Sequence, residues 1–293
     1  MIKRRKFSLQ LPSRTLVLGE RTLIMGVLNV TPDSFSDGGK FLDPQAAVDR
    51  AFAIEREGAD IIDIGGESAR PGSQGVSARE ELARILPVLE GLRGRLRIPI
   101  SLDTRRADVA EASAALGVEI LNDVTGLRGD PRMADVARRH NLPIVLMHMR
   151  GEPRTMQKGP FAKDVLRDVK DGFLRILARA GKAHLPKSRI ILDPGIGFGK
   201  NYAQNFELIG GLPQFANLGC ALLIGTSRKA FLGHALGGAA EDQRIWGTAA
   251  TVAAAIVGGA HIVRVHDVAE MVQVARVSDC ILAPKRAETS KKP

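Results

Sequence analysis

Cysteines are scarce in this chain, and long apolar runs are missing. The two cysteines, Cys220 and Cys280, lie far apart and show no C-x-x-C spacing, which argues against a disulfide framework. The basic start at residues 1–15 is not followed by an apolar stretch, so we expect no signal peptide. The longest weakly polar run, AATVAAAIVGGA at 249–260, is too short to span a bilayer. We therefore predict a cytoplasmic protein without a membrane partner.

Aromatic and acidic residues are also few. Aromatics make up 4% of the 293 residues, whereas hydrophobic residues make up 44%, which indicates one large aliphatic core. The 32 acidic side chains are outnumbered by 42 basic ones, which gives a formal net charge of +10. Such a surplus favours anionic partners such as phosphorylated metabolites. We interpret most of it as a solvated basic surface and predict no nucleic-acid partner.

Eight short aliphatic segments alternate with amphipathic stretches along the chain. They predict strands at 22–30, 60–66, 98–103, 118–123, 142–149, 189–195, 221–226 and 261–267. Eight strand–helix units are the number that closes a parallel (β/α)8 TIM barrel. An open doubly wound sheet would more often have fewer strands and a glycine-rich turn after the first strand, and this sequence lacks that turn.

The N-terminal residues 6–19 read as two short strands joined by a Pro-Ser-Arg turn. We predict that this β-hairpin caps the bottom of the barrel. The helix after the first barrel strand is expected to begin after Asp43, with Pro44 as its first residue, and to end near Gly58. We expect a single barrel domain over 1–284 and a flexible basic tail over 285–293.

Polar side chains stand at or just beyond the end of nearly every predicted strand. In chain order they are Asn29, Asp63, Glu67, Asp103, Asn122, His148, Asp193, Lys229, Arg264 and His266. The carboxyl ends of barrel strands converge on one face, where active sites form. Alternation in the last strand places Arg264 and His266 on one side and Val263 and Val265 on the other. A rim of carboxylates, amides and cations predicts a polar, partly charged ligand.

Two of the carboxylates have purely local alternatives. Asp103, or Thr104 beside it, would cap the following helix. Asp193 would belong to the turn at Pro194. Capping and turn roles are common for Asp, so each remains open when the residue is considered alone.

Two of the basic side chains have structural alternatives as well. His148 would be a neutral core histidine with a satisfied hydrogen bond. Arg264 would form an internal ion pair with Asp63 or Asp267. Taken together these alternatives are less favourable, because polar groups buried at nearly every strand end all need partners.

Two long polar segments leave the same rim. The first lies within GVLNVTPDSFSDGG at 26–39 and carries Phe35, and the second, GGESARPGSQGVS at 65–77, carries Arg70. Ordinary connections in α/β units need only about 2–6 residues. We expect both segments to act as lids that close over bound substrates and exclude water.

Eight motifs, in order along the chain, resemble dihydropteroate synthase. They are MGVLNVTPDSFSDGG, DIGGESARPG, SLDT, LNDVTGL, MHMRGEPRTMQ, DPGIGFGKNYAQN, GTSRKAFLG and RVHDV. The resemblance runs from about residue 22 to the end of the last helix. It implies a (β/α)8 barrel that joins 6-hydroxymethyl-7,8-dihydropterin pyrophosphate to p-aminobenzoate. Pyrophosphate would be released, with Mg²⁺ as the cofactor, in folate synthesis.

The resemblance also implies a role for each residue at the rim. The pterin would be bound by Asp103, Asn122, Met147, Asp193 and Lys229. The pyrophosphate would be bound by Asn29, Arg70, Arg264 and His266, and the Mg²⁺ ion by Asn29. The p-aminobenzoate slot would be formed by Phe35, Ala69, Arg70, Pro71 and Ala230. Catalysis would depend on Asp103, Lys229, Arg264 and His266.

The implied mechanism is an SN1-like loss of pyrophosphate, after which the arylamine adds to the pterin cation. The protein would stabilise the leaving anion, orient the amine and exclude water. The chain departs from the family pattern at Ala69, where Thr is usual, and at Ala230, where many members have Ser. Both positions bear on p-aminobenzoate and sulfonamide binding rather than on the pterin residues.

Two other functions fit parts of this pattern. A pterin-binding methyltransferase barrel acting on methyltetrahydrofolate would share the Asp and Asn residues, but it would not need the two lids or RVHDV. A non-catalytic paralogue that binds pterin or nucleic acid is supported only by Ala69 and the net charge.

The final helix, 267–282, is apolar over more than one stripe, and the helix before it is rich in alanine. We therefore expect a homodimer through helices 7 and 8, which follow the seventh and eighth barrel strands.

Overall fold

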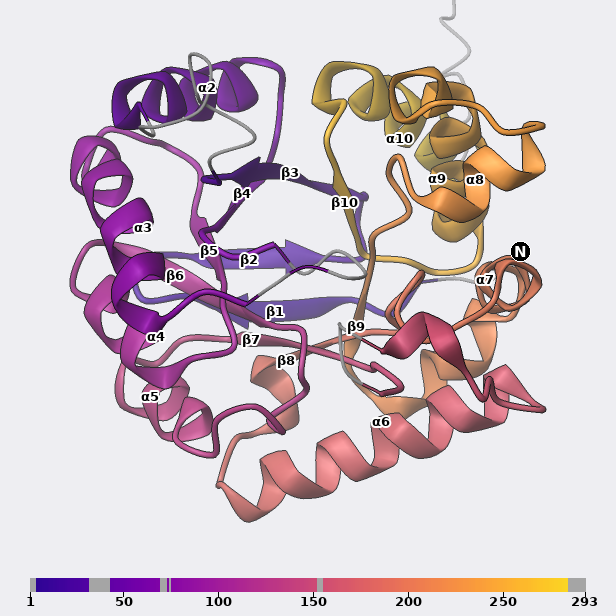
Figure 1. Ribbon diagram of the computed structural model, residues 1–293, viewed down its shortest axis with the longest axis horizontal. Helices are drawn as coiled ribbons and strands as arrows, with labels where there is room; N and C mark the ends of the chain where they lie inside the picture. The colour runs from indigo at the N-terminus through magenta and orange to yellow at the C-terminus, as the bar shows by residue number, and fades with distance from the viewer. Residues whose placement is uncertain (1–3, 32–42, 69–72, 74, 152–154, 284–293) are drawn as a thin grey trace, which may run out of the picture.

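Eight parallel strands close into a barrel in the computed structural model, which describes residues 4–31, 43–68, 73, 75–151 and 155–283. Around the cylinder their order is β10, β3, β4, β5, β6, β7, β8 and β9 (Figure 1). The strands are β3 Leu23–Asn29, β4 Ile61–Gly65, β5 Ile100–Asp103, β6 Val118–Asp123, β7 Ile144–Met147, β8 Ile190–Asp193, β9 Ala221–Ile224 and β10 Ile262–Val265. Each lies inside one predicted range, so the TIM-barrel prediction is confirmed.

Helices surround the barrel and connect its strands. They are α2 Pro44–Arg56, α3 Ala78–Leu92, α4 Ala107–Ala114, α5 Met133–Arg139, α6 Val165–Lys182, α7 Tyr202–Gly210, α8 Ala230–Ala235, α9 Ile245–Val257 and α10 Val268–Leu282. Short 3-10 turns lie at Met156–Lys158, Lys187–Arg189, Leu212–Leu218 and Glu241–Arg244. Helix α2 begins as predicted, because the Asp43 side chain accepts a hydrogen bond from the backbone N–H of Gln45 and Pro44 is the first helical residue. Among the described helices, none has the length and apolar character needed to cross a membrane.

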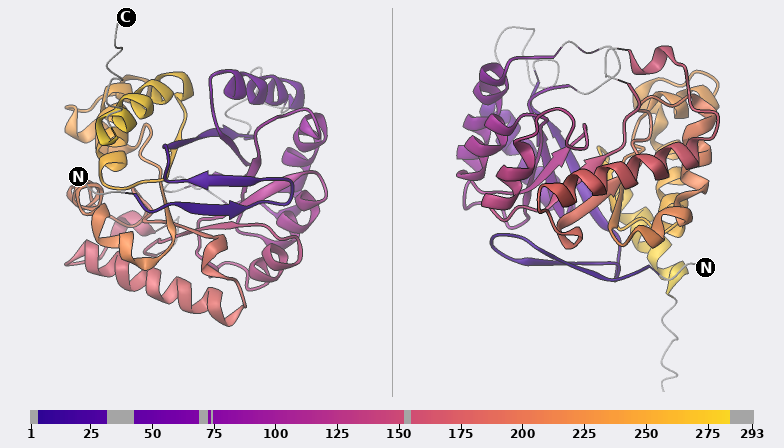
Figure 2. Two further views of the ribbon diagram at one scale, coloured as in Figure 1. Left: turned by 180° about the vertical axis from the view of Figure 1, so that it is seen from behind. Right: turned by 90° about the horizontal axis from the view of Figure 1, so that it is seen from below.

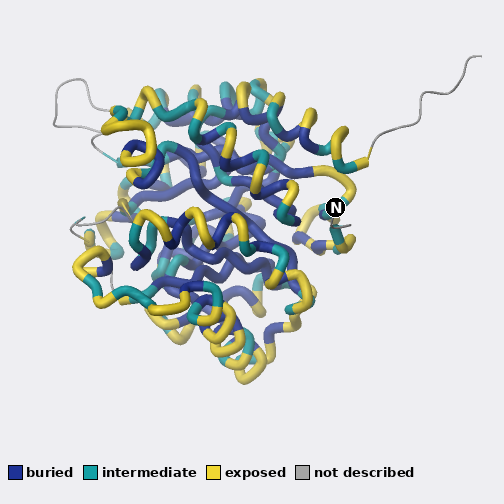
Figure 3. Tube along the Cα trace, turned by 90° about the vertical axis from the view of Figure 1, so that its right-hand side faces the viewer, coloured by how far each residue is buried: buried dark blue, intermediate teal, exposed yellow. Residues whose placement is uncertain are grey.

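The apolar core lies mainly between the barrel and its helices. Outward-facing strand residues such as Val263 and Val265 pack there against helical residues such as Phe173 and Ile256. In Figure 3 the central strands are buried, while the helices alternate buried and exposed positions. This arrangement leaves the inward-facing strand residues to fill the cylinder itself.

The N-terminal hairpin closes one end of the cylinder. Strands β1 Phe7–Gln10 and β2 Thr15–Leu18 pair antiparallel and lie across the amino-terminal end of the barrel (Figure 2). The leucines that fill this end come from the hairpin: Leu9, Leu11 and Leu18. They pack on inward-facing barrel residues, among them Met25, Ile61, Ile120, Val145, Ile191 and Leu223. The predicted cap at the bottom of the barrel is confirmed.

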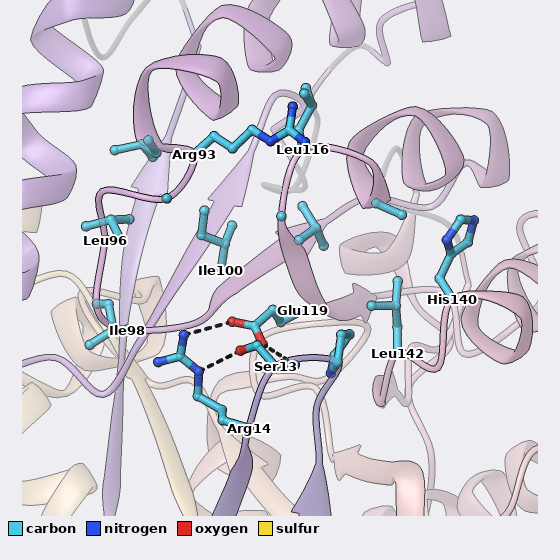
Figure 4. A pocket seen from close by; sticks show the side chains of 16 residues that line it. Ser13, Arg14, Arg93, Leu96, Ile98, Ile100, Leu116, Glu119, His140 and Leu142 are labelled. Atoms are coloured by element: carbon cyan, nitrogen blue, oxygen red, sulfur yellow. Dashed lines mark hydrogen bonds and ion pairs between the residues drawn. The ribbon is translucent and has the colours of Figure 1, made fainter.

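A cavity of about 400 Å³ lies beside the hairpin turn at this closed end (Figure 4). Leucine and isoleucine side chains form part of its wall, including Leu96, Ile98 and Leu142. Its buried carboxylate, Glu119, accepts a hydrogen bond from the Ser13 N–H at 3.2 Å and lies 3.4 Å from an Arg14 guanidinium nitrogen. The carboxylate at this end is therefore occupied by the hairpin itself.

Candidate active site

The carboxyl-terminal rim of the barrel contains a partly buried ion-pair network centred on Arg264. Its Nε donates to Asp63 at 2.6 Å, and its Nη2 donates to Asp103 at 2.9 Å. Asn122 donates its side-chain amide to Asp63 at 3.0 Å. The four side chains come from β4, β5, β6 and β10, so barrel closure brings together residues that are far apart in sequence.

Strand register explains why these side chains point inward. Gly65 pairs with Asp103, and Asp103 pairs with Asn122, so both polar residues occupy the same face of neighbouring strands. Asp63 lies two residues before Gly65 and shares its face. Asp63 is therefore inside β4, which corrects the expectation that it follows the strand.

The alternatives for Asp103 and Arg264 are settled by these contacts. Helix α4 begins after Arg106 without a side-chain cap, and Thr104 accepts only from the nearby Arg106 N–H at 3.2 Å. Asp103 turns to Arg264 instead of capping the helix. Arg264 pairs with Asp63, as one alternative proposed, while Asp267 pairs with Arg228.

The electrostatics of the rim are dominated by the cost of burying charge. Burial raises the pKa of Asp103 to about 7, and repulsion from Asp63 adds to the shift, while Arg264 opposes it. Burial also raises the pKa of Asp193, against the pull of Lys229. Burial lowers the pKa of Lys229 to about 8. Titration near neutral pH is typical of groups that perform chemistry.

Asp193 and Lys229 are two further charged residues of the mouth, and they interact electrostatically with each other and with Arg264. One oxygen of Asp193 accepts a hydrogen bond from the backbone N–H of Gly195 at 2.7 Å. Asp193 therefore has the turn role that was predicted as an alternative, and this role uses one of its two oxygens. Gly195 has a φ of +67°, and a side chain there would collide with the His148 carbonyl oxygen. Lys229 donates to the Ile196 carbonyl and lies 4.9 Å from the centroid of the Phe198 ring.

Methionine side chains form an apolar cluster at the rim. Met147, Met149 and Met156 form a small buried cluster, with Phe198 packed against it. Met147 was predicted to contact a flat ring, and the cluster provides an adaptable apolar surface of that kind. The sequence analysis did not single out Met149, Met156 or Phe198, because their proximity depends on how two loops fold over the rim.

His148 belongs to the core rather than to the polar mouth. Burial lowers its pKa to about 2, and nearby cations add to that shift. Its Nδ1 lies 3.2 Å from the ammonium of Lys200, which also donates to the carbonyl oxygens of His148 and Phe198. The neutral core interpretation of His148 is therefore correct, and Lys200 is a buried cation that the sequence analysis missed.

The remaining candidates fall at different distances from this centre. Asn29 is the last residue of β3, half-buried and in register with Gly65. His266 lies just after β10, with its Nδ1 3.0 Å from the Ser227 hydroxyl. Ala230 is exposed and is the first residue of helix α8. Four candidates and the tail lie outside the described residues: Phe35, Ala69, Arg70, Pro71 and the segment 285–293.

A cavity of about 310 Å³ opens at this rim beside Asp103. Arg105 and Arg128 are among its lining residues, together with Glu67. Glu67 is held by Arg105 at 3.0 Å and by Arg106 at 2.6 Å, and these arginines hold the pKa of its carboxyl below the usual range despite its burial. The cavity is thus lined by both charge signs, and Asp103 of the ion-pair network forms part of its wall.

A magnesium ion fits the donor chemistry of the rim at Asn29. The residue occupies the inward-facing register at the open end of β3, where its amide oxygen is a hard ligand. Mg²⁺ is usually bound by one or two protein oxygens together with substrate phosphates and water. Asn29 thus suits an ion that arrives with a phosphorylated substrate.

Comparison with known proteins places the chain in a family. The family model described as "Pterin binding enzyme" matches residues 25–266. Dihydropteroate synthase of Synechocystis sp. is 46% identical over 90% of this chain and 91% of its own length. The Xanthomonas albilineans dihydropteroate synthase structure with 4-aminobenzoic acid has a TM-score of 0.89 and 39% identity, covering 96% of this chain and 100% of that one. The structure of the same enzyme with 7,8-dihydropteroate has a TM-score of 0.85 and 38% identity, covering 95% and 100%.

Proposed function

The chain belongs to the dihydropteroate synthases, and from that premise we propose how its carboxyl-terminal rim carries out their reaction. It condenses 6-hydroxymethyl-7,8-dihydropterin pyrophosphate with p-aminobenzoate, giving 7,8-dihydropteroate and pyrophosphate. Similarity over nine-tenths of the chain favours this synthase over the methyltransferase barrel. The observation that carries the proposal is the convergence of Arg264, Asp63, Asp103 and Asn122 beside Lys229 and Asp193.

The pterin edge is recognised by fixed acceptors. Its donors resemble a guanidine fork, which a carboxylate accepts well. Asp193 has one oxygen held by Gly195, which orients the carboxylate. Asn122 gives its N–H to Asp63, so its amide oxygen is the group presented to the ligand. Met147 packs on the ring face, and Lys229 meets the ring carbonyl.

The reaction begins with cleavage of the bond between the pterin CH₂ and the pyrophosphate oxygen. The bonding electrons leave with the pyrophosphate, and the ring carries the resulting positive charge. Ionised Asp103 stabilises that charge, while Arg264 and His266, with Arg70, neutralise the leaving anion. The contacts of Arg264 to Asp63 and Asp103 use two of its five N–H donors. The amine nitrogen of p-aminobenzoate then bonds to the CH₂ and loses a proton to solvent.

Mg²⁺ belongs to the same proposal. Asn29 would hold the ion through its amide oxygen, and the ion would supply positive charge to the pyrophosphate when bound. The p-aminobenzoate slot is assigned to Ala230 at the start of α8 and to Phe35, Ala69, Arg70 and Pro71.

Product formation tests the proposal directly. The chain is incubated with the dihydropterin pyrophosphate, with and without p-aminobenzoate and with and without Mg²⁺. We expect pyrophosphate and dihydropteroate to appear together only when all three components are present. Pyrophosphate release that does not depend on the amine, or no release at all, would contradict the proposed reaction.

Assembly as a homodimer through helices 7 and 8, which correspond to α8 with α9 and to α10, is also part of the proposal. These neighbouring helices (Figure 1) expose Trp246 by 80%, Val277 by 62% and Ile281 by 57%. Exposed apolar side chains of this size favour burial against a second copy. Sedimentation should give a dimer for the wild type and a monomer for Trp246→Glu. Leu174→Glu, on the exposed side of α6, is the matched control and should remain dimeric.

A further inference from the structure

Asp63 touches two of the proposed binding residues but is itself fully buried beneath them. Its exposed fraction is 0%, and it accepts hydrogen bonds from both Arg264 and Asn122. Both donors use the same oxygen, Oδ2. A single carboxylate oxygen thus fixes the direction of a guanidinium and of an amide.

The second carboxylate oxygen of Asp63, Oδ1, needs a hydrogen-bond partner, and so does the hydroxyl of Ser101 on the adjacent strand. Ser101 pairs in register with Asp63 on the adjacent strand, so both side chains point into the cylinder. Both residues are fully buried. Within the described part of the chain, neither Asp63 Oδ1 nor the Ser101 hydroxyl has a hydrogen-bond partner. Buried polar atoms without a protein partner are the groups that internal water molecules bind, and such a water needs two or more polar partners.

We propose that Asp63 is the positioning residue of the site, that it holds Arg264 and Asn122 in their binding orientations, and that an internal water links it to Ser101. This inference rests on the proposed function, because it assigns a role in that reaction. Asp63 acts through its partners and does not touch the substrate. A buried carboxylate shared by two ligand-binding side chains preorganises both before substrate arrives.

Burial is the main cause of the raised pKa of Asp103, and the charge of Asp63 adds to it. The groups that face Asp103 are Arg264 on β10, Asp63 on β4, Glu81 on α3 and Asp123 on β6. Three of these are carboxylates that raise the pKa of Asp103, and Arg264 lowers it. An amide in place of Asp63 removes one repulsive charge and leaves Arg264 paired with Asp103 alone. The pKa of Asp103 should then fall.

The variant Asp63→Asn tests this positioning role. We expect kcat/KM to fall on the order of 10²-fold, because Arg264 and Asn122 lose their shared anchor. The acid limb of the kcat/KM profile should move to lower pH, which a loss of stability alone would not cause. The crystal structure of the substrate-free variant should show Arg264 displaced from residue 63 while it keeps its contact with Asp103.

Asp279→Asn is the matched control. Asp279 is a partly buried carboxylate that, like Asp63, holds an arginine, here Arg4, and it also binds Thr22, but it lies at the opposite end of the barrel. This control should lower stability and leave the acid limb in place. An Asp63→Asn enzyme with wild-type kcat/KM, an unmoved acid limb and Arg264 in its original position would overturn the inference.

The internal water is tested separately, and this test stands even when Asp63→Asn does not fold. A crystal structure of the wild type should show a water within hydrogen-bond distance of Asp63 Oδ1 and Ser101 Oγ. Ser101→Ala should lower kcat/KM about fivefold, the worth of roughly one hydrogen bond. Ser113→Ala, which removes an equally buried hydroxyl on α4, should leave kcat/KM unchanged.

The outcomes separate the inference from the proposed function. A wild-type chain that forms no dihydropteroate overturns the reaction, whereas displacement of Arg264 in Asp63→Asn still supports the positioning role. A wild-type site without that water, combined with full activity in Ser101→Ala, overturns the part assigned to Ser101.

Discussion

The two ends of this barrel are built from the same eight strands, but they are filled in opposite ways. At the amino-terminal end the hairpin inserts Leu9, Leu11 and Leu18, and the nearby carboxylate of Glu119 is occupied by Ser13 and Arg14. At the carboxyl-terminal end, carboxylates are buried, crowd one another and share cations. A cavity lies at each end, of about 400 Å³ at the closed end and about 310 Å³ at the open end. The position of shared buried charge, rather than cavity size, therefore identifies the site.

The largest expected difference between the two ends comes from removing Arg264. Arg264→Ala should lower kcat by about 10²–10³-fold, because it deletes a donor for the departing anion. It should also cost about 3–5 kcal/mol of unfolding free energy, because Asp63 is left as an unpaired buried charge. Turnover assays and denaturant unfolding measure the two effects. Wild-type turnover in this variant would remove Arg264 from the mechanism.

Leucine removal at the closed end should affect only stability. Leu18 is fully buried, and Leu18→Ala should cost about 2–5 kcal/mol of unfolding free energy through lost packing. At temperatures where the variant is folded, kcat/KM should equal that of the wild type. A selective loss of activity in the folded variant would show that the two ends are coupled.

The pH dependence should be set by the open end. With the pKa of Asp103 raised to about 7, kcat/KM should rise with pH through that value as the carboxylate ionises. The free energy of unfolding should depend on pH in the opposite direction. An unfolded Asp ionises near pKa ~3.9, so the folded state binds the extra proton between that value and about 7, and stability falls as pH rises across this window. Asp103→Asn should abolish both trends, and persistence of the kinetic limb would assign it to another group.

The smallest effect is expected at the ion pair of the closed end. Arg14 is well exposed, and its pair with Glu119 should contribute about 0–1 kcal/mol. Arg14→Ala should therefore unfold close to the wild type and keep full kcat/KM. A loss comparable to that of Arg264→Ala would refute the contrast between the two ends.

The barrel could be predicted from the sequence because its strands and helix ends are marked by residues that lie close together in the chain. Each strand is a short aliphatic segment, and Asp43 with Pro44 marks the start of α2. The rim was also predictable, since polar residues at strand ends must meet once the barrel closes. The sequence did not show which polar residues would pair. Arg264 pairs with Asp63 rather than with Asp267 because the strand register places it there, and the register is fixed only when the barrel closes.

Other features of the site could be predicted only in part or not at all. Asp63 was predicted as a rim residue and as a possible partner of Arg264, but only closure of the barrel reveals that one of its oxygens accepts from both Arg264 and Asn122. Lys200 is buried behind His148 by the fold of a glycine-rich turn. The apolar patch of Met149, Met156 and Phe198 likewise depends on tertiary packing of loops.

A crystal structure of the chain with a bound dihydropterin pyrophosphate analogue tests the central claim most directly. The account predicts the pterin edge against Asp193 and Asn122, with the ring on Met147 and the pyrophosphate beside Arg264 and His266. A pterin bound in the leucine-lined cavity near Glu119, or at the rim without contact to Asp193 and Asn122, would contradict it.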